Sequence, residues 1–345
     1  MSEKNEIDCR AVSNELMYEL EKGGFKEFVE FVRKTEKENL GYRLVLCFRG
    51  NSSPSNVVIY YHNHMVWKLN KSQGKKLKVT ISFNHARYTK DWESKLNELY
   101  EKYNFSLNKK GKGKLKLKDI VSEIKNGSNG YLTVTSDSFD KNFVEGSFYI
   151  LKTIIDDFFG KEHEYDYFKG AKGQNRFYLE KMRQHELYLN YNNTNNGLFI
   201  YDLEFAQKKN KDIPENDNQP DMVGIRFKNG KPEKLVLIEV KCKKTSMENK
   251  SGLEEHTGKM EKYIKNEIAI KNRIEEANKI LQQYSILQLR KVQTIKIPEN
   301  IPIEIRIILT DEAIEYFDKN NYLKLYIEKN YKVERVNDNQ VELYK

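Results

Sequence analysis

The chain has little cysteine and proline, and it has no long apolar run. Its three cysteines, Cys9, Cys47 and Cys242, are odd in number and widely spaced. This pattern favours neither a disulfide framework nor a zinc site. No apolar stretch approaches the roughly 20 residues of a membrane span. The opening MSEKNEIDCR lacks the apolar core of a signal peptide. We therefore expect a cytoplasmic protein with no membrane partner.

Positive charge is in excess. Sixty Lys and Arg against 51 Asp and Glu give a formal net charge of +9. Such a balance favours a polyanionic partner, because phosphates attract Lys and Arg. Abundant Lys, Asn, Ile and Tyr also follow from AT-rich coding, so charge alone does not identify the partner. The hydrophobic content of 38% and the length of 345 residues fit a globular chain with room for two domains.

The first half predicts an α+β domain over residues 1–165. Helical spacing of apolar residues covers 13–36 and is interrupted by Gly23-Gly24. Short strand-like runs then predict a small antiparallel sheet, at 42–50, 57–62, 65–69 and 77–83. Helices are expected near 91–103, 116–126 and 146–159. The glycine-bearing stretch 160–175 is typical of a linker, and the basic run 109–119 either follows a phosphate backbone or is a solvated face.

Residues 166–345 predict a second domain of the α/β class. The expected order is a helix, three strands, a long helix and a strand, at 175–190, 197–206, 221–227, 234–242, 252–284 and 303–311. A helical turn and a closing VELYK strand follow. Asn229-Gly230 is a strong hairpin signal between the second and third strands. We expect a mixed sheet enclosed by the 175–190 and 252–284 helices.

The hairpin brings two carboxylates together. Centred on Gly230, it aligns Asp221 with Glu239, each nine positions away. Opposed residues in an antiparallel pair have Cα atoms about 4.5–5.5 Å apart. Two carboxylates so close repel unless a cation neutralises them, and oxygen ligands favour Mg²⁺ or Mn²⁺. The backbone carbonyl of Val240 could complete the shell of such an ion.

Lys241 lies two residues after Glu239 and therefore points to the same side of the sheet. Its ammonium could orient a water or act as a base beside a metal. Glu-x-Lys is common on solvated edge strands, but here the flanking LVLI and Val240 are apolar on both faces. This indicates a central strand. Asp221, Glu239 and Lys241 together suit metal-assisted hydrolysis of a phosphodiester.

Pro220-Asp221 followed by Glu239-Val240-Lys241, in an α-β-β-β-α-β order, resembles the PD-(D/E)XK nuclease superfamily over about 170–312. The resemblance implies a restriction-endonuclease-like core, dependence on Mg²⁺ and DNA as the usual substrate. The stretch CFRGNSSPSNVVIYYHNHMVWKL is similar to the leading domain of some uncharacterised bacterial proteins that carry such a core. Recognition, regulation or dimerisation is the expected role of that domain.

Two further residues are candidates for the site. In the 175–190 helix, Glu186 lies on the stripe expected to face the sheet, and it matches the acidic residue that the superfamily often supplies from its first helix. Glu180 is its rival, and a surface glutamate is the alternative for either. His256 lies on an apolar helical stripe, where it either approaches the scissile phosphate or is a core histidine. Asp202 and Glu204 either enter the site from a neighbouring strand or lie on a partly exposed face.

We therefore expect a Mg²⁺-dependent deoxyribonuclease, with Asp221, Glu239 and the Val240 carbonyl as metal ligands and Lys241 activating water. RNA stays open as a substrate. A catalytically silent nucleic-acid-binding or scaffold protein on the same fold is the rival, and the intact acid-acid-lysine set argues against it. Restriction or another form of mobile-element defence is the expected context, with DNA repair as the alternative. A homodimer is consistent with the superfamily, and the absence of a GxxxxGK[ST] loop implies that any translocation needs a partner ATPase.

Overall fold

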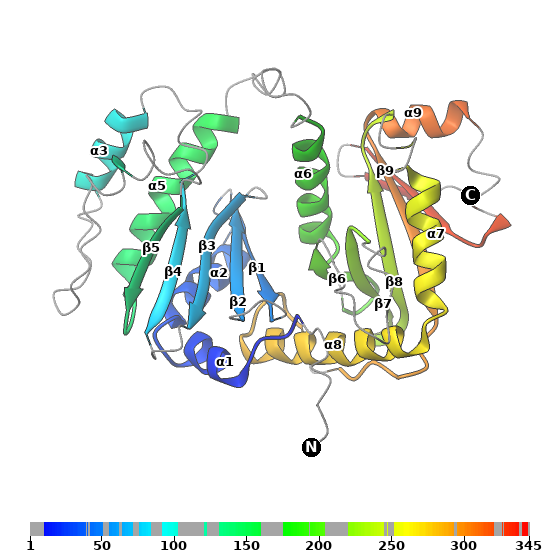
Figure 1. Cartoon of the computed structure of the whole chain (residues 1–345), viewed down its shortest axis with the longest axis horizontal. Coiled ribbons are helices and arrows are strands. Elements are labelled where there is room, and N and C mark those ends of the chain that lie inside the picture. The colour runs from blue at the N-terminus through cyan, green and yellow to red at the C-terminus, as the bar shows by residue number, and fades with distance from the viewer. Residues whose placement is uncertain are drawn as a thin grey trace. The chain divides into compact units, whose positions relative to one another are not determined.

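Two β-sheets organise the chain, one in each half (Figure 1). The structure is a computed structural model that describes residues 10–38, 40, 42–50, 55–61, 64–71, 76–83, 92–102, 121–122, 131–159, 175–192, 194–203, 220–244, 247, 252–292, 295–320, 326, 328–337 and 340–343. Contacts divide the chain into an N-terminal unit, Cys9–Gly170 with Ile286–Leu289, and a C-terminal unit that holds Ala171–Ser285 and Arg290–Lys345. Within the described ranges, none of the helices has the length and apolarity that crossing a membrane requires.

The N-terminal unit contains a five-stranded antiparallel sheet. Its strands follow the chain order, β1 (Leu44–Arg49), β2 (Asn56–Tyr61), β3 (His64–Lys71), β4 (Leu77–Ser82) and β5 (Tyr131–Ser136). The predicted four-stranded meander is confirmed. Sequence analysis missed β5, which pairs with β4 along its whole length although about fifty residues separate the two strands. That pairing closes one edge of the meander.

The helices of this unit cover one face of the sheet. They are α1 (Asn14–Glu21), α2 (Lys26–Lys37), α3 (Trp92–Lys102) and α5 (Lys141–Phe159). The interruption expected at Gly23-Gly24 separates α1 from α2, and a Cβ on Gly24 would lie 2.7 Å from the backbone oxygen of Asp137. The indole of Trp67 packs edge-on against Phe28 of α2 and donates a hydrogen bond of 3.1 Å to Ser147 of α5. Aromatic packing therefore fixes both helices on the sheet.

Several expectations fall outside the described residues. Of the helix expected at 116–126, the structure describes residues 121 and 122, and both are helical. The basic run 109–119 is not among the described residues. Of the stretch 160–175, only Asn175 is described, so the boundary between residues 165 and 166 stays a prediction.

The C-terminal unit is built on a mixed six-stranded sheet, ordered β11-β10-β9-β8-β7-β6. The strands are β6 (Gly197–Leu203), β7 (Met222–Lys228), β8 (Lys231–Lys241), β9 (Ile303–Thr310), β10 (Lys332–Asn337) and β11 (Gln340–Leu343). The pairs β6–β7 and β7–β8 are antiparallel, the pairs β8–β9 and β9–β10 are parallel, and β11 is antiparallel to β10. Helices α6 (Asn175–Asn190) and α7 (Leu253–Ile264) lie on opposite sides of this sheet (Figure 1). The α/β class with a mixed sheet is thus confirmed.

Two details differ from the expected order. The single helix expected over 252–284 is two helices, α7 and α8 (Glu267–Ile286). Oδ1 of Asn266 accepts a hydrogen bond of 3.0 Å from the backbone N–H of Ala269. An asparagine cap of this kind begins a new helix. After β9, the expected helical turn is α9 (Glu312–Lys319), but β10 lies between it and the closing strand and was not predicted.

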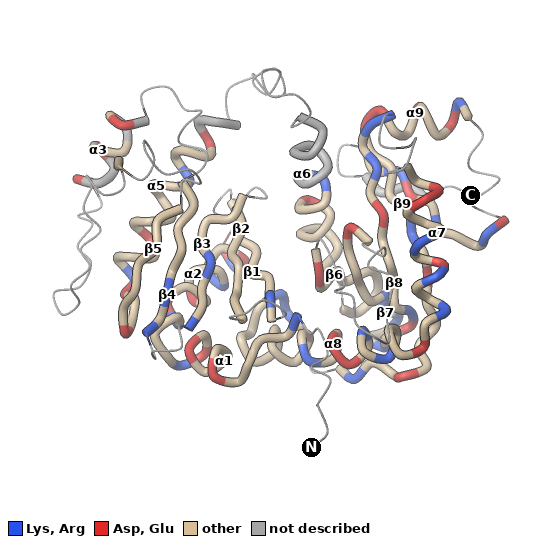
Figure 2. The backbone as a smooth tube through the Cα atoms, viewed as in Figure 1, with Lys and Arg blue, Asp and Glu red and all other residues tan. Residues whose placement is uncertain are grey.

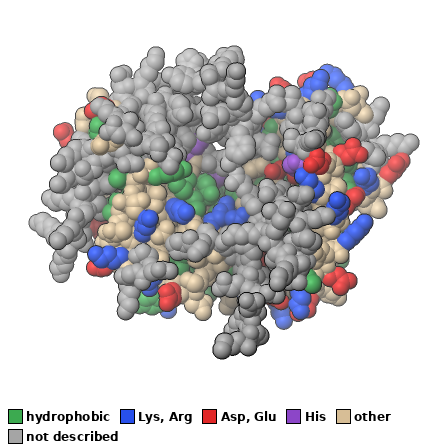
Figure 3. Space-filling model, in the orientation of Figure 1, with side chains coloured by type: hydrophobic (Ala, Val, Ile, Leu, Met, Phe, Trp, Pro, Cys, Tyr) green, Lys and Arg blue, Asp and Glu red, His purple; other side chains and the backbone are tan. Residues whose placement is uncertain are grey.

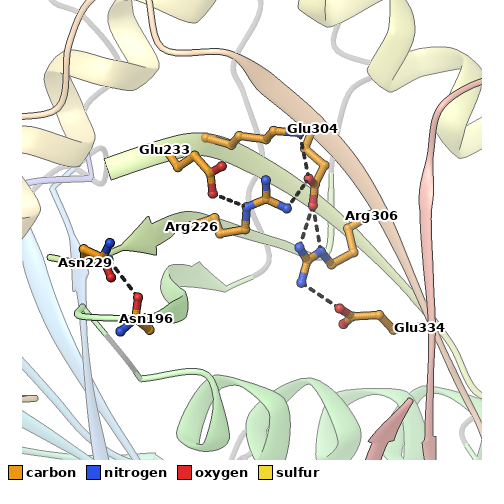
Figure 4. A network of polar contacts seen from close by, with 8 residues as sticks. Asn196, Arg226, Asn229, Glu233, Glu304, Arg306 and Glu334 are labelled. Carbon is orange, nitrogen blue, oxygen red and sulfur yellow. Dashed lines mark hydrogen bonds and ion pairs between the residues drawn. The ribbon is translucent and has the colours of Figure 1, made fainter. Parts of the chain in front are cut away.

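An ionic network crosses the face of the sheet that carries α6 (Figure 4). Arg226 of β7 donates to Oε2 of Glu304 on β9, at 2.9 Å, and Arg306 donates to Oε1, at 2.6 and 3.0 Å. Arg306 also donates to Oε1 of Glu334 on β10, while the hydroxyl of Tyr191 donates to Oε2, each at 2.8 Å. All four carboxylate oxygens therefore have a donor, as buried polar groups require.

Candidate active site

The hairpin of β7 and β8 has the register that the sequence predicts at its open end. Met222 pairs with Ile238. Asp221 directly precedes β7, so the same register continues to Glu239. At the turn, Asn229 and Gly230 have φ values of 51° and 72°, which is why an Asn-Gly pair suits this position. The hairpin thus brings Asp221 and Glu239, which are eighteen positions apart in the sequence, to the same end of the β7–β8 pair.

Asp221 ends the ladder between the two strands. The backbone N–H of Val240 donates a hydrogen bond of 2.7 Å to Oδ2 of Asp221. The N–H and C=O of one strand residue face the same neighbouring strand, so the carbonyl of Val240 also faces β7. The residue opposite Val240 in this register is Pro220, which has no N–H to donate. Asp221 and the Val240 carbonyl are therefore directed to one place, where β7 begins.

Glu239 is completely buried on the central strand β8, with a relative exposure of 0%. Its Oε1 lies 2.5 Å from Nζ of Lys241 and 2.6 Å from Nδ1 of His256 on α7. These are close charge contacts, although their angles are not those of regular hydrogen bonds. The structure thus brings together three of the predicted residues, whereas Asp221, at the start of the neighbouring strand, contacts the backbone of Val240.

The second oxygen of Glu239 differs from those of the ionic network. No described residue donates a hydrogen bond to Oε2 of Glu239. Burial acts to raise the pKa of this carboxyl, but the positive charge of Lys241 and the contact with His256 outweigh it, so the pKa lies below its ordinary value. Glu239 is therefore an ionised, buried carboxylate, and one of its oxygens has no donor in the described part of the chain.

The residues present fit a divalent cation with oxygen ligands. Among the described residues, no group of three or more His, Cys, Asp or Glu side chains is placed to hold a metal ion. Asp221, Glu239 and the Val240 carbonyl supply two carboxylates and one carbonyl. Mg²⁺ is commonly bound through one or two carboxylates and keeps several waters. The unpartnered Oε2 of Glu239 is the atom that such an ion would satisfy.

Glu186 does not join this group. Its carboxylate is 2.7 Å from Arg183 NH1, and the side chain is 42% exposed. Arg183 also binds both oxygens of Asp311, at the end of β9, at 2.8 and 3.0 Å. The stripe expected to face the sheet is not the buried side of this helix, which is formed by Gln184, His185, Leu187 and Tyr188. Glu186 is instead held by the arginine one turn earlier. The side chain of its rival Glu180 is not among those described.

The remaining candidates that the structure describes have contacts with residues other than Glu239. Asp202 is buried, and its Oδ2 lies 3.8 Å from Arg273 NH1 on α8. Glu204 is not among the described residues. Of the lysines near this end of the sheet, Lys259 pairs with Glu255, and Nζ of Lys244 lies 5.3 Å from the centre of the Tyr316 ring.

Sequence analysis did not single out Asp311. Burial acts to raise its pKa, but the hydrogen bond from Arg183 outweighs this effect, and the charge of Lys243 adds to it, so the pKa lies below its ordinary value. Asp311 has a φ of 53°, and it connects the end of β9 to α6 through Arg183. Its only signal in the sequence is its place directly after the apolar run of β9.

Comparisons of the chain with protein-family models, with curated proteins and with solved structures give no match. The roles of the site residues therefore rest on the geometry of this chain.

Proposed function

We propose that the chain is a metal-dependent nuclease that hydrolyses phosphodiester bonds of DNA, with Asp221, Glu239 and Lys241 in its active site. The observation that carries the proposal is the contrast between two buried glutamates of one sheet. Glu304 has donors for both oxygens, whereas Oε2 of Glu239 has none among the described residues. A purely structural carboxylate at such depth is normally satisfied. The difference favours a ligand at Glu239.

The arrangement of β6, β7, β8 and β9 supports a restriction-endonuclease-like core. Three strands form an antiparallel meander, and the chain then returns through α7 and α8 to place β9 parallel to β8. Asp221 precedes the second strand of this meander, and Glu239 and Lys241 close the third. This placement agrees with the element order on which the resemblance to the PD-(D/E)XK superfamily depends.

Asp221, Glu239 and the Val240 carbonyl would hold Mg²⁺ or Mn²⁺. When bound, such an ion polarises a phosphate oxygen and makes a coordinated water more acidic. Lys241 points to the same side as Glu239. We assign its ammonium to orient the attacking water and, once a bound cation has replaced it beside Glu239 and it has released its own proton to solvent, its neutral amine to accept the proton of that water. His256 contacts the same carboxylate from α7, so we assign it to positioning Glu239 rather than to the chemical step.

DNA is the proposed substrate because the net charge of +9 suits a polyanion and the resemblance implies DNA. RNA cleavage and a silent, nucleic-acid-binding chain are the competing functions. Both make distinct predictions for the same assay, because a silent chain cuts nothing and an RNase spares DNA.

The test is incubation with supercoiled plasmid, single-stranded DNA and RNA, each with and without Mg²⁺. We expect DNA to be cut only with the metal, and Asp221→Asn to lower the rate by at least about 100-fold, the upper end of what perturbing a metal site costs. Glu315→Gln is the matched control, because Glu315 is exposed on α9 and pairs only with Lys319. Metal-independent cutting, or equal cutting by Asp221→Asn, would contradict the proposal.

A further inference from the structure

As far as the structure describes them, the two sheets end in four edge strands, β1, β5, β6 and β11. An edge strand presents N–H and C=O groups that pair with another chain unless something covers them. At β1 they are covered at both ends of the strand. The N–H of Leu44 donates to Oγ1 of Thr35, at 3.1 Å. The N–H of Gly50, directly after the strand, donates to the carbonyl of Arg10, at 2.8 Å.

Both edges of the C-terminal sheet are also protected. In β6, the N–H of Ile200 donates to the carbonyl of Tyr191, at 3.1 Å, and its C=O accepts from Arg290, at 2.5 Å. The outer side of β6 is therefore bonded within the chain. Strand β11 is only four residues long and contains Glu342. Short length and charge are two of the features that keep an edge strand from pairing with another chain.

Strand β5, at the outer edge of the N-terminal sheet (Figure 1), has none of these protections. Its six residues, YLTVTS, include no charge and no proline, and Figure 2 shows the strand in tan. It pairs with β4, and no other described strand pairs with it. Tyr131, Thr133 and Thr135 are exposed. Aromatic and β-branched residues favour strands, so β5 has the composition of a strand that accepts a further neighbour.

We propose that β5 pairs with β5 of a second copy of this chain, in antiparallel orientation, so that two five-stranded sheets become one continuous sheet. Homo-oligomers most often have a twofold axis. An axis perpendicular to the sheet at Thr133 places this residue opposite itself. Leu132 then lies opposite Val134 of the second copy. Tyr131 lies opposite Thr135, so each pair joins residues on the same face, as antiparallel pairing requires.

Charge and side-chain pairing favour a second copy as the occupant of this edge. Two chains of net charge +9 repel each other, but pairing through β5 places no like charges opposite one another. Figure 3 shows the surface over this sheet as mainly uncharged, in tan and green, with a few blue side chains. Inside the sheet, the hydroxyls of Thr80 and Thr133 already lie 3.3 Å apart. The self-pairing of Thr133 repeats this threonine contact between the two copies.

The test is sedimentation equilibrium of the full chain over about 1–200 μM. An interface of one edge strand belongs to the small and weak class, so we expect a monomer–dimer equilibrium with Kd of about 10 μM. Thr133→Lys and Thr133→Glu are measured alone and as an equimolar mixture. Tyr18→Lys is the control, because Tyr18 is 59% exposed on α1 and the substitution adds the same charge. Equal melting temperatures show that the variants fold.

Each Thr133 variant alone should have a Kd raised by about tenfold or more, because the twofold axis opposes like charges. Their mixture should dimerise about as well as the wild type, since Lys then lies opposite Glu. Tyr18→Lys should leave the Kd unchanged.

Hydrogen exchange provides a second measurement, in which the amides of 131–136 should become more protected as the wild-type concentration rises. A monomeric wild type at about 200 μM, an undiminished dimer of Thr133→Lys, or a mixture that stays monomeric would overturn the proposal. Loss of the dimer in Tyr18→Lys but not in the Thr133 variants would also overturn it, by placing the interface on α1. None of these outcomes depends on the proposed nuclease function.

Discussion

Nζ of Lys241 lies 2.5 Å from Oε1 of Glu239, two positions earlier in the same buried strand. The contact is the expected one for residues on the same face of a strand. It means that Lys241 stabilises the charge of Glu239 whenever no other cation does so. The same lysine therefore has a structural role without metal and, in the proposed mechanism, a chemical role with it.

Replacing Lys241 separates these two roles through stability. Lys241→Ala should lower the free energy of unfolding by about 3 kcal/mol in EDTA, because removal of one partner leaves a buried carboxylate under-compensated. Saturating Mg²⁺ should recover most of this loss, since the ion binds only the folded chain and supplies the missing positive charge. Urea unfolding with and without Mg²⁺ measures both quantities. The variant Lys259→Ala, which removes a partly exposed lysine paired with Glu255, should change stability by less than about 1 kcal/mol in either condition.

Lys241→Arg tests the chemical role. Arginine keeps the positive charge beside Glu239 but does not release a proton at usable pH. We expect the variant to fold, to bind metal and to cut DNA poorly, at about 1% of the wild-type rate or less, in line with the loss of a general base. Single-turnover cleavage under saturating Mg²⁺ is the measurement. Cutting at the wild-type rate would show that Lys241 does not accept the proton.

His256 is expected to act through Glu239. His256→Ala should weaken Mg²⁺ binding by about 10–100-fold, which is typical for the loss of a residue that orients a metal ligand. Cleavage at saturating Mg²⁺ should recover to a large extent, because the side chain is not assigned to the chemical step. Thermal shift against Mg²⁺ concentration, paired with cleavage rates, distinguishes this from a catalytic histidine. Persistent inactivity at saturating metal would assign His256 to the reaction itself.

The sequence predicted those parts of the fold that depend on local pattern. The Asn229-Gly230 turn predicted the hairpin, and it pairs Lys228 with Lys231. A register shift between Arg226 and Phe227, which the sequence did not predict, then adds the one residue that brings Asp221 to the position opposite Glu239. The contact of His256 with Glu239 was neither of the two alternatives that the sequence offered, because an apolar stripe fixes the face of a helix and not the residue opposite it.

The missed elements depend on contacts between distant residues. Strand β10, KVERVN, contains three charges in its first four positions and resembles no buried strand by itself. It becomes one because Arg306, 28 positions earlier, pairs with Glu334. The pair of Glu186 with Arg183, three positions earlier on the same helix, was visible in the sequence. The second partner of Arg183, Asp311, is 128 positions away and could not be predicted in this way. Such compensation is set by tertiary structure, so no window of local sequence contains it.

The last prediction concerns Glu304, the centre of that compensation. Burial acts to raise its pKa, but Arg306, then Arg226 and Lys234, outweigh burial and hold the pKa below the ordinary value of 4.5. A carboxyl with a lowered pKa stabilises the fold above its unfolded pKa, and the contribution is lost as the pH falls through the folded value. The network should therefore weaken below about pH 4.5.

Glu304→Gln removes this charge and leaves the two arginines under-compensated. At pH 7 it should lower the free energy of unfolding by about 3 kcal/mol, as expected for one partner of a buried ion pair. The difference from the wild type should shrink as the pH falls below 4.5, because protonation removes the same charge from the wild type. Urea unfolding at pH 7, 5 and 3.5 measures this trend, with Glu315→Gln as the exposed control. A difference that stays constant across these pH values would show that the carboxylate charge of Glu304 does not stabilise the sheet.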